Sequence, residues 1–394
     1  MMSKWLKTKL DNVLTLQRGF DITKKEQKEG SIPIVSSSGI SSYHNEYKVN
    51  GPGVITGRKG TLGKVHYVEG NYWPHDTTLW VKDFKGNHSR FIYYYLLLMK
   101  LETYDVGASN PTLNRNHLHK LDILWPPLPI QKKIAAILSA YDELIENNNR
   151  RIAILEKMAE EIYKEWFVRL RFPGHEKVKI VKGVPEGWEV KSIGEIVDFL
   201  SGFSFKSDSY LSDAKYGIVT IKNVQDGFFV NKCSDYIDDY PSNMKSHCKL
   251  NTGDVLMSLT GNVGRVCHVI GDNFLLNQRV AKLEGKFNYS SQFIYYTFRN
   301  KSMVQLIENL SLGSTAQMNL SPIQLGKQKI VIPEQDILKK FEKLISPLSN
   351  EKIFLLNCCE TLKKSRDLLL PRLISGKLDV EDLDIAFPPA MVDE

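Results

Sequence analysis

The chain has 394 residues, 42% of them hydrophobic and 25% charged, which allows two or three globular domains and excludes a disordered or fibrous protein. Its longest apolar run, residues 91–99, is shorter than the roughly 20 residues of a membrane helix, so we expect no membrane partner. The net charge of +7 favours a polyanion such as nucleic acid, although an ordinary basic surface stays possible. Five cysteines without a CxxC pair, and lysines near the N-terminus without an apolar stretch behind them, predict a cytoplasmic protein with reduced thiols and no secretion signal.

The sequence repeats itself once, with an offset that grows along the chain from 183 to 207 residues. The matches keep a fixed order, so we predict a duplicated chain whose second copy carries small insertions in surface loops. The matching positions are Trp5 with Trp188, Gly19-Phe20 with Gly202-Phe203, Gly60 with Gly261, Phe91 with Phe293, Asn114 with Asn319, and Pro126 with Pro333.

Each copy begins with a mixed segment that we expect to fold as an α+β domain. β-Branched and aromatic runs at 53–56 and 64–68 alternate with turn residues, and a helical pattern follows at 89–100. The second copy has the same pattern at 254–257, 265–270 and 291–308. The expected boundaries are a first α+β domain over 1–128, a long helix over 129–172, a second α+β domain over 180–333, a second long helix over 334–380, and a tail over 381–394.

Each α+β segment is followed by a long helical pattern with one apolar seam. In the first helix the seam includes Ile137 and Leu144, and polar Asn148 interrupts it with steps of 3-4-4-3, which indicates a stutter in a coiled coil. Pro347 lies inside the second pattern and predicts a kink or break, while Pro371 and Gly376 are expected to end it. A helix over 131–169 would be ~58 Å long. We therefore favour pairing of the two helices as a coiled coil over two separate core helices.

No catalytic or metal-binding motif stands out in the sequence, which favours a binding subunit over an enzyme. There is no phosphate-binding loop, no nucleophile elbow and no zinc spacing among the histidines. Two alternatives stay open. One is a self-contained metal-dependent DNA endonuclease that uses Asp272 with residues 284–286, or Asp21 with residues 26–28. The other is a coiled-coil scaffold without sequence-specific DNA binding.

Polar, glycine-marked loops with basic residues recur in both copies, and they fit duplex DNA. Lys and Arg neutralise phosphates, and Asn, Gln and Arg can hydrogen-bond to base edges in the major groove. Ordinary turns have the same composition, so each loop taken alone has a purely structural alternative. The candidate DNA-binding residues are Lys24, Lys25, Ser38, Arg58, Lys59, Lys64, Ser109, Asn110 and Asn114 in the first copy, and Lys206, Lys222, Asn223, Asn262, Arg265, Arg279, Thr315 and Gln317 in the second.

Nearly the whole chain resembles the specificity subunit of type I restriction-modification enzymes. The resemblance depends on the order of two α+β domains and two long helices, and on three local phrases. The second junction departs from the family pattern, because Pro333 is followed by Glu334 where the first junction has a double proline. The phrases are Gly-Phe after an opening Trp in both copies, Leu124-Trp125-Pro126-Pro127-Leu128-Pro129-Ile130-Gln131, and the ending Leu369-Leu370-Pro371-Arg372-Leu373-Ile374-Ser375-Gly376-Lys377-Leu378.

The resemblance implies two target recognition domains, each reading one half of a bipartite, asymmetric site in double-stranded DNA. It implies an antiparallel coiled coil of the two helices that sets the spacer, and a pseudo-two-fold internal repeat. The expected partners are two methyltransferase (modification) subunits and motor-nuclease (restriction) subunits. S-adenosylmethionine, ATP and Mg are expected on these partners, and no cofactor is expected on this chain.

Overall fold

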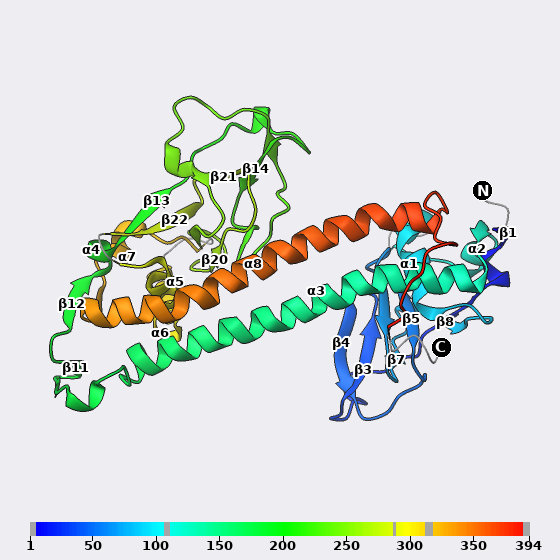
Figure 1. Cartoon of the computed structure of the whole chain (residues 1–394), viewed down its shortest axis with the longest axis horizontal. Helices are drawn as coiled ribbons and strands as arrows, with labels where there is room; N and C mark the ends of the chain where they lie inside the picture. Colours follow the sequence, from blue (N-terminus) through cyan, green and yellow to red (C-terminus); the bar gives the residue numbers. More distant parts are fainter. Residues whose placement is uncertain (1–4, 106–110, 287–288, 312–317, 389–394) are drawn as a thin grey trace. The chain divides into compact units, whose positions relative to one another are not determined.

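The computed structural model describes residues 5–105, 111–286, 289–311 and 318–388, and the chain divides into two units (Figure 1). Unit 1 comprises residues 1–146 and 361–394, and unit 2 comprises residues 147–360. Helices α3 (Leu128–Tyr163) and α8 (Gln335–Ile374) each contribute one segment to unit 1 and one segment to unit 2. Each unit therefore combines one α+β domain with segments of both long helices.

The described residues of unit 1 form three sheets. Strands β1 (Leu6–Lys9) and β9 (Asp122–Trp125) pair antiparallel. A four-stranded sheet has the order β2 (Thr15–Arg18), β8 (Thr78–Asp83), β5 (Gly53–Gly57) and β6 (Val65–Val68). A three-stranded sheet has the order β4 (Gly39–His44), β3 (Ile32–Ser36) and β7 (Trp73–Pro74), with β3 parallel to β7. The short helices are η1 (Leu10–Asn12), α1 (Ser89–Leu98), η2 (Leu101–Tyr104) and α2 (Arg115–His119).

Unit 2 repeats these sheets and adds two hairpins. Strands β12 (Glu189–Ser192) and β23 (Lys329–Ile332) pair antiparallel. One four-stranded sheet has the order β13 (Val197–Ser201), β22 (Val280–Gly285), β19 (Val255–Ser258) and β20 (Val266–His268). The other has the order β17 (Tyr236–Ile237), β14 (Tyr216–Val219), β21 (Phe274–Leu276) and β18 (Lys249–Leu250). The hairpins are β10 (Ile180–Val181) with β11 (Val184–Pro185) and β15 (Val224–Gln225) with β16 (Phe228–Phe229).

The remaining elements of unit 2 are short helices. They are η3 (Lys164–Val168), η4 (His175–Lys177), α4 (Ile193–Ile196), η5 (Ser207–Ser209), η6 (Ser246–Cys248), α5 (Ser291–Arg299), α6 (Lys301–Ser311) and α7 (Pro322–Gly326). Their starts carry local signals. The Ser290 hydroxyl accepts from the Phe293 amide at the start of α5, and Ser321 caps α7 ahead of Pro322.

The internal repeat is confirmed by the topology. The order β2-β8-β5-β6 in unit 1 recurs as β13-β22-β19-β20 in unit 2, and the parallel pair β3–β7 recurs as β14–β21. One predicted match needs correction: Asn114 caps α2 as Ser321 caps α7, so Asn114 corresponds to Ser321 and not to Asn319. An unrecognised insertion of two residues explains the error.

Each domain core is completed by both long helices. In unit 1, the start of α3 packs with the end of α8 through Ile134 and Leu373. In unit 2, Tyr163 near the end of α3 packs with Phe341 near the start of α8 (Figure 1). The helices are antiparallel, because Asn149 contacts Cys359 while Glu156 contacts Lys352. A fully buried side chain such as Phe341 stabilises the fold by about 1.5–3 kcal/mol.

The seam of the paired helices differs from the predicted one at one position in each helix. Leu144 is 46% exposed whereas Ile145 is 7% exposed, and likewise Leu344 is 45% exposed whereas Ile345 is fully buried. With Ile145 in the seam, the steps from Tyr141 through buried Asn148 are four, three and four residues, and the double step of four residues moves to 137–141–145. The predicted position of the stutter at Asn148 is therefore wrong by one step, because two adjacent apolar residues left the choice of seam residue open.

The predicted break at Pro347 is also wrong. Helix α8 continues through Pro347 and through Pro371, and it ends at Ile374, just before Gly376 with its φ of +70°. Proline in a helix costs about 3 kcal/mol. Burial of Phe341 and Ile345 on one side of Pro347 and of Leu355 on the other keeps both flanks helical.

Residues after α8 pack on unit 1 rather than extending away from it. Val380 is buried in the unit 1 core, and Trp5 lies against Gly376. The Lys133 ammonium donates hydrogen bonds to the backbone carbonyls of Glu381 at 2.6 Å and Leu383 at 2.8 Å. The segment expected as a tail, 381–394, is therefore held on unit 1 in its described part, where Ile385 packs against the same core.

Candidate nucleic-acid interface

Five loops of unit 1 converge beside the four-stranded sheet. Phe20 forms a parallel bridge with His75, and Lys59 forms an antiparallel bridge with Thr112. These bridges join loops that are 53 or more residues apart in the chain. The cross-loop hydrogen bonds are Arg58 N to Thr77 O at 2.7 Å, Leu113 N to Arg58 O at 2.9 Å, and Ser37 N to Thr77 Oγ1 at 3.4 Å.

Unit 2 brings the equivalent loops together by the equivalent bridges. Phe203 forms a parallel bridge with Asn277, and Thr260 forms an antiparallel bridge with Asn319. The Leu259 amide donates to the Arg279 carbonyl at 3.0 Å, which ties the turn before β22 to the loop after β19. The same loop frame is thus built twice from different side chains.

Most candidate residues of unit 1 lie on this loop surface. Arg58 is half-buried, and its Nε donates to the Asp76 carbonyl at 3.2 Å. Burial, followed by repulsion from Arg18, lowers the pKa of Arg58. The Asn114 amide oxygen accepts from the Asn116 backbone at 2.9 Å, so one of its hydrogen-bonding positions is used for capping. The exposed candidates are Lys24, Lys25, Ser38, Lys59, Lys64 and Asn114.

Sequence reasoning missed a charged cluster among these loops, formed by Arg18, Asp21 and Asp76. The Arg18 Nη2 donates to Asp21 Oδ1 at 3.2 Å and to Asp76 Oδ2 at 3.1 Å. Arg18 is the last residue of β2, directly before the Gly19-Phe20 pair that marks the repeat. That position was a usable signal, but its partner Asp76 lies 58 residues away and only the fold brings it near.

Some candidate DNA-binding residues of unit 2 are exposed, and others are buried or half-buried in the loops. Lys206, Lys222, Asn262 and Arg279 are exposed. Arg265 is half-buried, and its guanidinium donates to the Gln225 side-chain oxygen.

The prediction that Asn223 binds DNA is wrong, because this residue is only 2% exposed. Its Nδ2 donates to the Val230 carbonyl at 2.8 Å, and its Oδ1 accepts from the Thr220 amide at 2.9 Å. Because these hydrogen bonds hold the side-chain amide of Asn223 inside the turn, it cannot reach a DNA base. Ser109, Asn110, Thr315 and Gln317 lie outside the described residues.

One residue of each triplet suggested for a nuclease is engaged in local contacts. The Lys286 ammonium lies 3.1 Å from Asp198 and donates to the Gly194 carbonyl at 2.8 Å. In the other triplet, Glu26 accepts from the Thr23 amide at 2.7 Å. Within 5–105, 111–286, 289–311 and 318–388, no three His, Cys, Asp or Glu side chains cluster as metal ligands would. In those same ranges, no helix is both long and apolar enough for a bilayer span.

Comparisons with known proteins agree with this architecture. The sequence profile of the type I restriction modification DNA specificity domain matches residues 2–157 and again 185–357, one match for each copy. The type I restriction enzyme MjaIX specificity subunit of Methanocaldococcus jannaschii is 27% identical, over 91% of this chain and 89% of that protein. The HindI specificity subunit of Haemophilus influenzae is 22% identical, over 73% and 77%.

A solved structure supports the fold. The crystal structure of the type I restriction-modification S subunit from M. genitalium superposes with a TM-score of 0.62 at 17% identity, over 94% of this chain and 96% of that one. The two profile matches cover well over half of the sequence and coincide with the two structural copies. The chain therefore belongs to the type I restriction modification DNA specificity domain family.

Proposed function

We propose that the chain is the specificity subunit of a type I restriction-modification complex and that it recognises a bipartite, asymmetric site in double-stranded DNA. One observation supports this above all others: the same loop frame is built twice, with different side chains at equivalent positions. Two like frames with unlike side chains suit two unlike half-sites. A chain of this family contributes specificity, and the catalysis belongs to other subunits.

The side chains on the two frames differ in what they can read. Unit 1 offers a carboxylate-held arginine, and arginine recognises guanine by paired hydrogen bonds in the major groove. Unit 2 offers an exposed glutamine and arginine in the turn before β22, and glutamine suits adenine. The equivalent positions are Arg18 and Ser201, Arg58 and Leu259, Asp76 and Gln278, and Thr77 and Arg279.

The partners of this subunit would supply the chemistry. We infer two modification subunits that methylate adenine with S-adenosylmethionine, and motor-nuclease subunits that use ATP and Mg. The paired helices α3 and α8 would set the spacer between the half-sites. The complex would act in the reducing cytoplasm, which agrees with the free thiols of all five cysteines.

A domain exchange tests the function. Cells that carry this chain with its cognate modification subunit should show a bipartite methylation motif in their sequenced methylome. Replacing residues 1–125 by the equivalent domain of a relative should change one half of the motif and leave the other half and the spacer unchanged. An unchanged motif would favour the scaffold alternative, and cleavage of plasmid by the pure chain with Mg would favour the nuclease.

A further inference from the structure

A hairpin of unit 2 takes the place of a short turn in unit 1. Strands β3 and β4 of unit 1 are joined by residues 37–38, which include the candidate DNA-binding residue Ser38. The equivalent strands of unit 2, β14 and β17, are joined by residues 220–235, and this longer connection contains the hairpin β15–β16. Because ordering a longer connection costs more conformational entropy, the hairpin needs contacts that hold it in one position.

The hairpin packs against β20, the edge strand of the neighbouring sheet. The Gly227 amide in its turn donates to the Val266 carbonyl at 2.8 Å. Val224 is buried and pairs with buried Phe229. Successive side chains of a strand point to opposite faces, so the following residue, Gln225, points away from this core.

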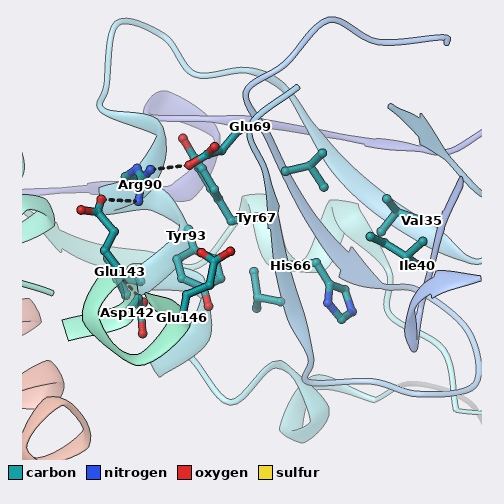
Figure 2. Close-up of a pocket in the computed structure, with 13 residues that line it drawn as sticks. Val35, Ile40, His66, Tyr67, Glu69, Arg90, Tyr93, Asp142, Glu143 and Glu146 are labelled. Atoms are coloured by element: carbon teal, nitrogen blue, oxygen red, sulfur yellow. Dashed lines mark hydrogen bonds and ion pairs between the residues drawn. The ribbon is translucent and has the colours of Figure 1, made fainter. Parts of the chain in front are cut away.

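Unit 1 leaves the corresponding strand edge uncovered. Strand β6 has the position of β20, and it lines an open cavity of about 570 Å³ together with α1 and the start of α3. Figure 2 shows His66 and Tyr67 of β6 beside this cavity. The hairpin therefore gives unit 2 a surface element that the short turn of unit 1 does not supply.

One arginine ties the turn of the hairpin to two helices. The Nε of Arg299 in α5 donates to Asp226 Oδ1 at 2.9 Å, and the same guanidinium pairs with Glu156 of α3. Gly227 has a φ of +72°, and a Cβ on it would lie 2.7 Å from Arg299 Nη2, so a side chain there would displace the guanidinium. Unit 1 has Leu97 at the position of Arg299. The arginine tie thus occurs in the copy that has the hairpin.

The outer face of the hairpin holds Arg265, a candidate DNA-binding residue. Arg265 ends the turn between β19 and β20, and Thr260 of that turn bridges Asn319 in the loop frame. The Arg265 guanidinium donates to Gln225 Oε1, and Gln225 Nε2 donates to the Lys222 carbonyl at 2.9 Å. Both ends of the Gln225 amide are used, which fixes its orientation. Because the amide is neutral, it holds the guanidinium without cancelling its charge.

An arginine held in this way suits a guanine base. A guanidinium has five N–H donors, so one bond to Gln225 leaves enough for paired hydrogen bonds to O6 and N7 of guanine in the major groove. A side chain that is already ordered also loses less entropy on binding. Unit 1 has exposed Lys64 at the position of Arg265, and a lysine is a flexible point charge that suits a phosphate.

We propose that Arg265 reads a guanine in the half-site of unit 2, and that the Arg299–Asp226 pair positions it through the hairpin and Gln225. The proposal rests on the proposed function, because it requires that unit 2 reads DNA. Arg265 touches the base, whereas Arg299 and Asp226 are positioning residues. Loss of the base contact and loss of the tie should therefore affect the same base pair.

The test measures discrimination at single base pairs. The full chain in complex with its cognate modification subunit competes for duplexes that carry each single-base substitution in both half-sites. Arg265→Ala should lower discrimination about 5- to 150-fold at one guanine and leave the half-site of unit 1 unchanged. Asp226→Ala removes a side chain that is 67% exposed, and it should lower discrimination about tenfold at that same guanine.

A double variant separates positioning from a general structural role. Arg265→Ala combined with Asp226→Ala should discriminate as Arg265→Ala does alone, because the tie acts through the arginine. Asp226→Glu keeps a carboxylate for Arg299 and should retain most of the discrimination. The control Asp238→Ala also removes an exposed aspartate of unit 2, and it should keep full discrimination with the same melting temperature as Asp226→Ala.

Four results would contradict the proposal. No change, or uniform weakening across all base variants, in Arg265→Ala would exclude a guanine contact by this residue. Unchanged discrimination in Asp226→Ala, or additive losses in the double variant, would exclude the positioning role. An equal loss in Asp238→Ala would do the same. A wild-type complex without any bipartite site would instead overturn the proposed function and this inference together.

Discussion

The two units share one frame but differ in the polar groups placed between sheet and helices. In unit 2, Glu156 of α3, Lys352 of α8 and Arg299 of α5 form a closed, buried cluster with Tyr295. Unit 1 has no buried lysine among its described residues: the position of Lys352 holds buried Ile145, and Tyr93 and Tyr94 line an open cavity beside Arg90. After duplication the apolar core and strand order were retained, while polar side chains diverged. Divergence of this kind lets two like domains take different ligands.

The largest expected effect is on the buried cluster of unit 2. Burial lowers the pKa of Lys352, while Lys352 and Arg299 hold the pKa of Glu156 below its usual range despite burial. Glu156→Ala would leave Lys352 buried without its carboxylate. We expect this variant to lower the free energy of unfolding by about 3–5 kcal/mol, measured by denaturant titration.

An exposed ion pair of the same two helices provides the control. Arg151 lies 2.6 Å from Glu351, and Lys352 lies 2.7 Å from Glu156. The Arg151 and Glu351 side chains are 53% and 40% exposed, whereas those of Lys352 and Glu156 are 4% and 18% exposed. Glu351→Ala should cost less than about 1 kcal/mol. If both variants lost a similar free energy of unfolding, burial would not determine how much the unit 2 cluster contributes to stability.

The next effect concerns recognition by the loop surface of unit 1. Arg18→Ala should relax the first half-site at one base pair and weaken binding there by about 1–3 kcal/mol. The matched change in unit 2, Ser201→Ala, should leave the second half-site unchanged. Competition binding with single-base variants of the site measures both. Uniform weakening across all base variants would make Arg18 a phosphate contact instead.

The smallest effect is a pH dependence in unit 2. Burial lowers the pKa of His268 well below its ordinary value of 6.5, and the corresponding residue of unit 1 is Tyr67. Below pH 6.5 the unfolded chain binds a proton that the folded chain does not, so stability present at neutral pH is lost as the pH falls. The loss is at most about 1.4 kcal/mol per pH unit.

His268→Gln, which cannot take up a proton, should flatten this dependence between pH 6.5 and 5. Denaturant titrations of the wild-type chain and the variant at several pH values would show the difference. Two parallel curves would mean that His268 is protonated equally in the folded and unfolded chains.

Much of the architecture could be predicted from the sequence because local residue patterns determine it. Apolar residues repeat every three or four positions along α3 and α8, glycine turns separate short strands, and matching phrases such as Gly19-Phe20 and Gly202-Phe203 mark the duplication. These signals act within a few helical turns or one strand, so no tertiary contact is needed to read them. The basic loops were located in the same way.

Only the tertiary structure decided the contacts between distant parts of the chain. Packing selected Ile145 over Leu144 for the seam, and it kept α8 helical through Pro347. Arg18 meets Asp76 across 58 residues, and Glu156 meets Lys352 across 196. Such pairs depend on how sheets and helices stack, and one sequence carries no local mark of a partner that is far away in the chain. The fold could therefore be predicted from the sequence, whereas the contacts that build the site could not.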